Sequence, residues 1–371
     1  MAKGAYIGVS SVARKVKKMY IGVGGVAKKV KKAYVGVNGV ARLFWSGSGE
    51  VTYYGTATAL DQGVSGGSGS IGNYALYAGG YYNEAKYSGN YYNTSLTKAT
   101  ITYALSAARY SIATANVGNS YLLFGGGINN SPADKVDAFD TSLTRTNPSK
   151  GLGTKVSQAE GTSVGNYALI AGGAASDYNS STVNAYNTSL TRSNPTALPE
   201  GKSKFGAASV GNYALFAGGL GSDWYSTVTA YDTSLTRSTP TALPEKKYNV
   251  RGAHVGNYAL FAGGNKYLNQ LVNTVTAYNT SLTRSAPAAL SEQKEMVSSA
   301  SLNGYALFVG GKTATTNSTA VEVYDASLTK TLSTPLSQGI YGSLSATVGN
   351  YALFPRGNAS SGGVIEVYQV A

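Results

Sequence analysis

The stretch VGNYALFAGG at residues 210–219 decides the fold, because it recurs unchanged at residues 255–264. The central tyrosines of all the copies are 45 to 47 residues apart. Seven copies at this period predict an all-β fold, a seven-bladed β-propeller with four short strands in each blade. The five weaker copies are IGNYALYAGG at 71–80, VGNSYLLFGGG at 117–127, VGNYALIAGG at 164–173, SLNGYALFVGG at 301–311 and VGNYALFPRG at 348–357.

Each repeat divides into four strands, which the fifth copy illustrates. We expect the first strand within 248–255, the second in YALFAGG after a Gly256-Asn257 turn, and the third in TVTAYNT at 274–280. A two-residue turn with positive φ at both positions favours a hairpin there. The fourth strand is expected within 281–290. Its proline, Pro287, like Pro195 and Pro240 in other copies, predicts an edge strand on the outside of the blade.

The two ends of the repeat region are complementary. Residues 51–60 read as an outer strand without a blade, and the last copy stops after a third strand at 364–370. We therefore expect 51–60 to pair with 364–370 and close the ring, which removes two exposed strand edges.

The glycine doublets and the VTAYD-like third strands resemble kelch repeats over residues 51–371. The chain departs from that pattern in the fourth strand, where Leu-Thr-Arg replaces a common Trp, and at Pro355-Arg356-Gly357, where the doublet is lost. The resemblance implies a propeller used for binding. Kelch-like copper oxidases need a Cys–Tyr crosslink and histidine ligands, so we expect that activity to be absent from a chain without cysteine.

The N-terminal 45 residues carry a different repeat, of 14 residues: AYIGVSSVARKVKK at 5–18, MYIGVGGVAKKVKK at 19–32 and AYVGVNGVARLFW at 33–45. Each has two β-prone segments around a two-residue turn, which predicts a β-hairpin. SGSGE at 46–50 is expected to be a hinge. The segment is similar to N-terminal repeats of tailed-phage and prophage structural proteins, which implies an anchoring or oligomerising arm.

The net charge of +13 is concentrated in that arm. Residues 1–45 hold ten Lys and Arg and no acidic residue, whereas the remainder has twenty Lys and Arg against seventeen Asp and Glu. We favour docking on an acidic protein partner, such as another virion protein, over nucleic acid or a merely solvated face. We also expect a homo-oligomer. The anchoring residues predicted are Arg14, Lys15, Lys17, Lys18, Lys28, Lys29, Lys31, Lys32 and Arg42.

The composition argues against catalysis. The chain has no cysteine, and its one histidine, His254, is expected to be structural. No metal-ligand spacing or repeated Asp box is visible, so we predict no cofactor, no metal and no enzymatic activity. No signal peptide and no membrane span are expected. Together with these expectations, the phage resemblance implies a virion protein made in the host cytoplasm.

One set of inter-strand loops is almost constant between copies, with Val-Gly-Asn and Thr-Ser-Leu-Thr. The other set varies and is rich in Tyr, Asn, Ser and Asp, as in LGSDWYS at 220–226. We predict that these variable loops lie on one face and bind a ligand, because adaptable polar groups and rigid aromatics suit recognition. The predicted ligand-binding residues are Tyr81, Tyr82, Tyr178, Asp223, Trp224, Tyr225 and Tyr267.

These observations favour a phage virion protein whose arm anchors it at the tail or baseplate and whose propeller contacts a host-surface glycan or protein. One alternative is a capsid decoration or head-fibre protein without a specific receptor. A second alternative is a glycan-active enzyme that uses Asp177 or Asp223, and a third is an intracellular adaptor.

Overall fold

The computed structural model describes residues 50–61, 63–357 and 363–370, together with the backbone of six strands among the first 49 residues. By contact clustering the chain divides into two units, Met1–Thr52 with Val370–Ala371, and Tyr53–Gln369. Each unit is described separately below.

The described part of the arm forms three two-stranded antiparallel sheets, one for each 14-residue repeat. In each sheet the YIGV-like segment pairs with the VARK-like segment that follows it, so the predicted hairpins are confirmed. The pairs are β1 (Tyr6–Val9) with β2 (Val12–Lys15), β3 (Tyr20–Val23) with β4 (Val26–Lys29), and β5 (Lys32–Val37) with β6 (Val40–Ser46).

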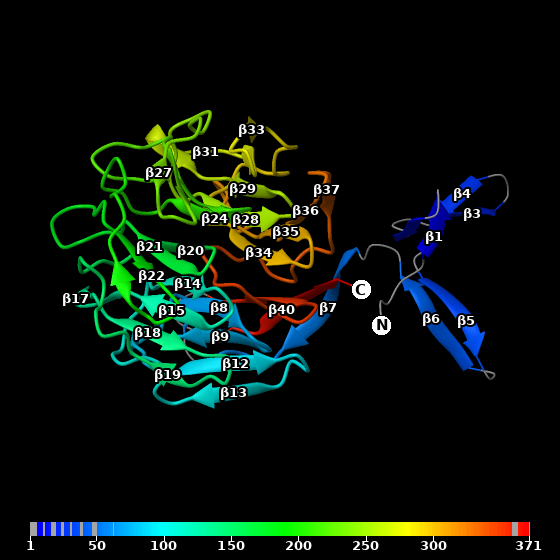
Figure 1. The fold of residues 1–371 in the computed structure, drawn as a ribbon, viewed down its shortest axis with the longest axis horizontal. Coiled ribbons are helices and arrows are strands. Elements are labelled where there is room, and N and C mark those ends of the chain that lie inside the picture. The colour runs from blue at the N-terminus through cyan, green and yellow to red at the C-terminus, as the bar shows by residue number, and fades with distance from the viewer. Residues whose placement is uncertain are drawn as a thin grey trace. The chain divides into compact units, whose positions relative to one another are not determined.

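The second unit contains seven four-stranded antiparallel sheets, so the seven-bladed β-propeller is confirmed (Figure 1). The first three blades are β8 (Gly67–Ile71), β9 (Tyr74–Ala78), β12 (Gly89–Asn93) and β13 (Lys98–Ile101); β14 (Ala113–Val117), β15 (Tyr121–Gly125), β18 (Val136–Phe139) and β19 (Arg145–Thr146); and β20 (Glu160–Val164), β21 (Tyr167–Ala171), β22 (Val183–Tyr186) and β23 (Arg192–Ser193).

The remaining blades follow the same plan. They are β24 (Gly206–Val210), β25 (Tyr213–Ala217), β26 (Val228–Asp232) and β27 (Arg237–Ser238); β28 (Arg251–Val255), β29 (Tyr258–Ala262), β32 (Val275–Asn279) and β33 (Arg284–Ser285); β34 (Ser298–Leu302), β35 (Tyr305–Val309), β36 (Val321–Asp325) and β37 (Lys330–Leu332); and β38 (Ala346–Val348), β39 (Tyr351–Pro355), β40 (Ile365–Val370) and β7 (Val51–Ala57).

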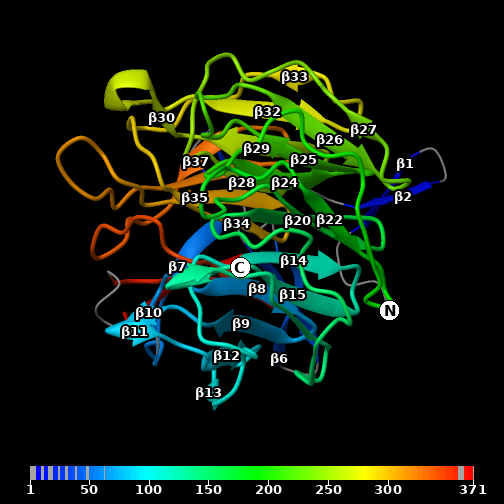
Figure 2. The ribbon, with the colours of Figure 1, turned by 90° about the vertical axis from the view of Figure 1, so that its left-hand side faces the viewer.

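The first strands of successive blades contact one another in a closed series, from β8 through β14, β20, β24, β28, β34 and β38 back to β8. They therefore line a central channel, and Figure 2 shows the blades from a second direction. The seventh sheet is completed by β7 beside β40, as predicted from the two ends of the repeat region. The N-terminal strand ends at Ala57 rather than at residue 60.

The Gly-Asn turns differ from the prediction. Positive φ is found at the glycine alone, as at Gly256 (52°), and Asn257 does not share it. Glycine first is the order of a type II′ turn, which needs one positive φ and not two. Both residues have positive φ at Asn303-Gly304, where the order is reversed and the turn is type I′.

The fourth strands are shorter than expected, with only two residues in blades two to five. Side chains hold this outer region to the preceding blade instead. Tyr231 at the end of a third strand donates its hydroxyl to the Thr196 carbonyl at 2.6 Å, and Arg237 donates to the Ala197 carbonyl at 2.6 Å. The tyrosine bond recurs in six blades at 2.6–3.1 Å, donated by Tyr92, Tyr186, Tyr231, Tyr278, Tyr324 and Tyr368.

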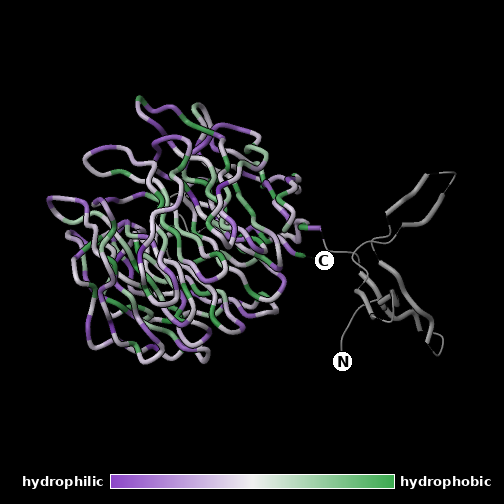
Figure 3. Tube along the Cα trace, turned by 45° about the horizontal axis from the view of Figure 1, so that its top comes forward, coloured by the Kyte–Doolittle hydropathy of each residue, from purple (hydrophilic) through white to green (hydrophobic). Residues whose placement is uncertain are grey.

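The core consists of separate apolar clusters, each shared by two neighbouring blades. In one of them Leu215 and Val228 of blade four pack with Phe261 and Tyr278 of blade five. Figure 3 shows the apolar segments inside the blades and hydrophilic segments on the loops. No helix in the described residues is long and apolar enough to cross a membrane.

Candidate functional site

The variable loops and the start of the central channel lie at the same edge of each blade. Strand β20 begins opposite the end of β21, because Glu160 pairs with Ala171, and Ala171 pairs with Val183 at the start of β22. In blades two to six the loop before the first strand is also bridged to the variable loop of its own blade, as at Ser203 and Leu220. We call this side the variable face and the opposite side, with the Thr-Ser-Leu-Thr turns, the constant face.

Hydroxyl groups join neighbouring blades along one part of the channel wall. Thr114 donates to the carbonyl of Ser68 at 2.7 Å, and Ser68 donates to that of Ser345 at 2.8 Å. Ser299 likewise donates to the carbonyl of Gly252 at 2.8 Å. First strands of adjacent blades are not hydrogen-bonded as a sheet, so these side-chain bonds replace a backbone ladder.

The equivalent positions in blades three and five are glycines. A Cβ at Gly161 would lie 2.2 Å from the Thr114 carbonyl oxygen, and a Cβ at Gly252 would lie 2.2 Å from that of Ala207. These blades therefore approach by direct backbone contact, which only glycine permits.

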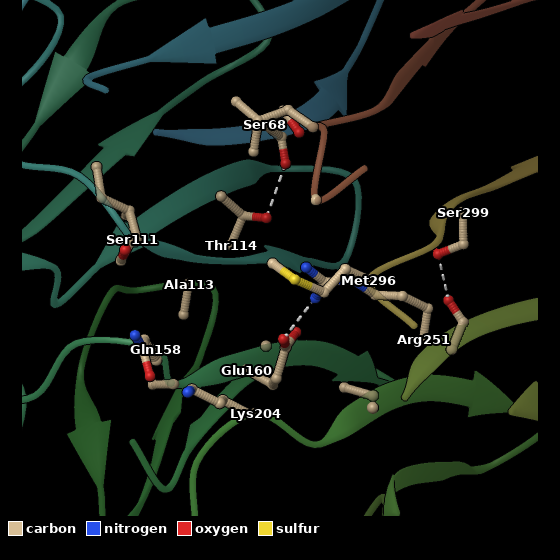
Figure 4. Close-up of a pocket in the computed structure, with 18 of the residues that line it drawn as sticks. Ser68, Ser111, Ala113, Thr114, Gln158, Glu160, Lys204, Arg251, Met296 and Ser299 are labelled. Atoms are coloured by element: carbon tan, nitrogen blue, oxygen red, sulfur yellow. Dashed lines mark hydrogen bonds and ion pairs between the residues drawn. The ribbon is translucent and has the colours of Figure 1, made fainter. Parts of the chain in front are cut away.

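A pocket of about 480 Å³ lies at the variable face and is lined by residues of all seven blades (Figure 4). Its most polar feature is an ion pair between Glu160 of blade three and Arg251 of blade five, 2.8 Å apart. The pair spans blade four, where Gly206 offers no side chain. The two side chains are 26% and 34% exposed, so a ligand in the pocket can reach both.

Burial raises the pKa of Glu160 above its ordinary value, although the charge of Arg251 and its hydrogen bond act in the opposite direction. A carboxyl group with a raised pKa is better suited to proton transfer than one with an ordinary pKa. The third charged side chain of the lining is Lys204. Its Nζ lies 5.9 Å from the ring centre of Tyr248, and no carboxylate of the described residues pairs with it.

A ring of residues with left-handed backbone surrounds the pocket mouth, one from each of blades two to seven. Their φ angles lie between 52° and 59°. Backbone hydrogen bonds connect several of them, including Asn249 N–H to the Lys204 carbonyl at 2.7 Å and Gly342 N–H to the Met296 carbonyl at 2.7 Å. The ring residues are Ser111, Gln158, Lys204, Asn249, Met296 and Gly342.

Three of the residues predicted from the variable loops come together in a second, outer cleft of about 470 Å³ between blades four and five. The rings of Trp224 and Tyr267 meet edge to face with centroids 5.1 Å apart. Asp223 pairs with Lys246 beside them, and hydrogen bonds from Lys246 and from the Trp224 backbone N–H lower the pKa of Asp223. A carboxylate held ionised in this way is poorly suited to donate a proton.

The other predicted ligand-binding residues line neither cavity. Tyr81 packs on Tyr110 with ring centroids 5.2 Å apart, and Tyr82 follows it in the small strand β10 (Tyr81–Tyr82). Tyr178 is exposed, and the hydroxyl of Tyr225 lies 3.0 Å from that of Ser222. Whether these residues contact a ligand stays a prediction, as does a role for Asp177, which lies outside both cavities.

Several predictions fall on the arm, where the structure describes backbone strands alone. Arg14, Lys15, Lys28, Lys29, Lys32 and Arg42 lie in those strands, while Lys17, Lys18 and Lys31 lie outside the described residues. The expected hinge at 46–50 also falls largely outside them, because 47–49 are not described. The role of the basic residues in anchoring stays a prediction.

No protein-family model matches this chain, and no curated protein sequence matches it significantly. Solved structures do resemble it. A fungal alcohol oxidase of the AA5 family, in complex with copper, is similar with a TM-score of 0.64 and 12% identity, over 87% of this chain and 76% of the oxidase. The structure of YjhT is similar with a TM-score of 0.56 and 14% identity, over 71% of this chain and 95% of that protein. At these identities the likeness shows the β-propeller fold.

The oxidase corrects one prediction from the sequence, that this protein is not an enzyme. An enzyme exists on the same fold, so neither the propeller nor its repeats give ground for excluding catalysis. The copper chemistry of that neighbour does not fit the side chains found here. The chain has no cysteine and only His254, and in the described residues no three His, Cys, Asp or Glu side chains are grouped to hold a metal ion.

The sequence analysis missed Glu160 and Arg251. They occupy one repeat position, which carries Gly67, Ala113, Gly206 and Ser298 at the start of other first strands. Charged side chains at a position that is otherwise small or apolar were the available signal. Their pairing across 91 residues depends on blade geometry that spacing alone does not reveal.

Proposed function

We propose that this protein is a glycan-active, kelch-like propeller, which binds a polyhydroxylated ligand in the central pocket and exchanges a proton with it through Glu160. The Glu160–Arg251 pair, partly exposed in a polar pocket, is the observation that supports this proposal. The pair joins a carboxylate acceptor and a guanidinium donor, the two kinds of group that hold a sugar hydroxyl from opposite sides.

The remaining lining favours the same ligand class. Hydroxyl groups of Ser68, Thr114 and Ser299 and the amides of Gln158 and Asn249 surround the pair. A volume of about 480 Å³ lies within the usual range for small-molecule sites. The three hydroxyl groups already donate bonds to neighbouring blades, and their oxygens can still accept hydrogen bonds from a ligand.

The chemistry supported by the pocket is a step that needs one proton donor or acceptor. Glycoside hydrolysis normally uses two carboxyl groups on either side of the bond. Glu160 is the one carboxylate among the residues that line the pocket, and Asp177 and Asp223 do not line it. General acid–base catalysis at a hydroxyl or carbonyl group therefore fits better than hydrolysis.

Titration calorimetry of the whole chain with a panel of neutral and acidic mono- and disaccharides tests the proposal. Arg251→Met should weaken binding by roughly tenfold or more, because it removes a charged hydrogen-bond donor. Glu160→Gln should retain much of the affinity, since the amide still bonds to hydroxyls, but abolish any conversion of the bound sugar seen by NMR. Trp224→Ala, in the outer cleft, is the matched control and should leave both unchanged.

The absence of any saccharide binding would overturn this function. So would a loss of binding in Trp224→Ala with none in Arg251→Met, because the outer cleft would then be the site.

A second candidate function concerns where the propeller works. The arm consists of three basic hairpin repeats similar to those of tailed-phage structural proteins, and we propose that it attaches the protein to an acidic surface on a virion protein. The propeller would then meet a host-surface glycan. Attachment of this kind gains avidity when several copies sit on one particle.

Co-sedimentation of the full chain with particles tests attachment. Replacing Lys15, Lys28, Lys29 and Arg42 with Gln should weaken it and reduce its dependence on salt, because charge pairing between surfaces is screened by ions. Replacement of four propeller lysines that lie outside both cavities is the control. Equal weakening in the two variants would count against an arm-specific contact.

A further inference from the structure

Left-handed backbone recurs at two positions of the repeat, and the two positions differ in how their side chains vary. On the constant face the residue is leucine in six blades, Leu96, Leu143, Leu190, Leu235, Leu282 and Leu328, with φ between 56° and 62°. At the pocket mouth it is serine, glutamine, lysine, asparagine, methionine and glycine in turn, at almost the same φ.

The leucines have a structural explanation. Each follows an Asn or Asp whose Oδ1 accepts backbone N–H groups two and four residues further on, as Asn187 does from Ser189 and Thr191 at 3.0 and 2.9 Å. The leucine side chain then packs into an inter-blade cluster, as Leu190 does with Ala168 and Tyr186. Packing therefore offsets the strain of the left-handed backbone.

The residues at the pocket mouth lack that explanation. Gln158 is exposed, Lys204, Asn249 and Met296 are part-exposed, and all four line the pocket. Glycine or asparagine is the low-strain choice at positive φ, yet Gln158, Lys204 and Met296 hold that conformation. Strained residues of this kind gather at ligand sites, where the surrounding structure enforces them.

The ring is also discontinuous next to the ion pair. Its backbone bonds connect Gln158 N–H to Ser111 and Asn249 N–H to Lys204, but among the described backbone bonds none connects Lys204 to Gln158. The gap lies between blades three and four, beside Glu160. Since Glu160 and Arg251 neutralise one another, Lys204 leaves the lining with one uncompensated positive charge.

We propose that the left-handed ring selects the ligand and that Lys204 binds an anionic group on it, a carboxylate or a phosphate. This inference rests on the proposed sugar site and adds the class of sugar that the site prefers. Gln158 and Asn249 then contact hydroxyl groups, and Met296 contacts an apolar face of the ligand. Variation at one repeat position supplies different chemistry around a single pocket without altering the blades.

The test compares matched ligands on the whole chain by calorimetry: glucose, glucuronate and glucose 6-phosphate, and the corresponding galactose set. The wild type should bind an acidic member at least about tenfold more tightly than its neutral counterpart, since a charge-assisted hydrogen bond contributes about that factor. Lys204→Met should remove that preference, whereas Lys246→Met, which lies outside the central pocket, should keep it. The uronate and the phosphate distinguish the two kinds of anion.

A stability measurement separates selection from a structural role. Lys204→Gly should raise the melting temperature, because it relieves left-handed strain, while it removes the preference for the acidic ligand. Neutral and acidic sugars bound equally by the wild type would overturn this inference and leave the sugar site standing. A protein that binds none of the probes would overturn both.

Discussion

The constant face and the variable face use the same strained backbone in opposite ways. At one, six leucines occupy left-handed positions and pack into the core; at the other, six different residues occupy them around a pocket. Because both sets belong to one repeat in one chain, backbone geometry alone cannot account for the difference. The comparison teaches that within this repeat packing keeps a residue type constant, whereas the proposed ligand site would account for a different residue in each blade.

The largest expected effects on stability come from substitutions of two aspartates three residues apart, one near each face. Asp137 and Arg109 form a fully buried ion pair at 2.6 Å next to the variable face. Asp137→Ala should cost about 3–5 kcal/mol in the free energy of unfolding, because an unpaired guanidinium remains buried. Asp140→Ala removes acceptors for two N–H groups of a constant-face turn at 2.8 Å each and should cost about 1–2 kcal/mol. Urea unfolding measures both, and equal losses would break the comparison.

At the repeat position that Arg109 occupies in blade two, blades four and five have Lys202 and Lys247. These two buried lysines predict that the free energy of unfolding depends on pH. Burial lowers the pKa of Lys202 and of Lys247 to about 8. The unfolded chain then binds more protons than the folded one above pH 8, so stability should rise with pH. Between pH 8 and 10 the gain should be about 2 kcal/mol for each lysine.

Unfolding midpoints across that range measure the effect, and the double variant Lys202→Met, Lys247→Met should remove most of it. A stability that falls from pH 8 to 10 in the wild type would contradict the assignment. Above pH 10 the buried tyrosines act in the opposite direction, because burial raises the pKa of residues such as Tyr231.

Glycine substitution at the two left-handed positions tests the comparison directly. Leu190→Gly on the constant face should cost about 2 kcal/mol, since the loss of a buried side chain exceeds the relief of strain. Met296→Gly at the pocket mouth should instead stabilise the protein by about 1 kcal/mol. Thermal unfolding gives both values, and a shared sign would mean that the two sets of residues serve the same purpose.

The outer tyrosine bonds should give the smallest and most uniform effects. Tyr231→Phe and Tyr278→Phe each remove one hydroxyl that donates to the preceding blade, at 2.6 and 2.7 Å. Each should cost about 1 kcal/mol. Near-equal losses of stability in the two variants would show that the tyrosine bond serves the scaffold in the same way in each blade, unlike the residues at the pocket mouth. A difference of several kcal/mol between Tyr231→Phe and Tyr278→Phe would argue against equivalent blades.

The sequence pattern predicted the seven blades, the hairpins of the arm and a ring closure by residues 51–60, of which 51–57 form the strand. It also placed Trp224 and Tyr267 on one face, where the structure brings them together. Sequence could not give the central pocket, since Glu160 and Arg251 meet across a blade that separates them. Nor did it predict the left-handed ring, because lysine, glutamine and methionine carry no signal for positive φ.

The most direct test of the central claim is a crystal structure of the whole chain soaked with the saccharide that binds most tightly. The account predicts the sugar in the central pocket, within hydrogen-bond distance of Glu160 and Arg251, and its anionic group, where present, beside Lys204. A sugar found only in the outer cleft at Trp224 and Tyr267, with the central pocket empty, would contradict it.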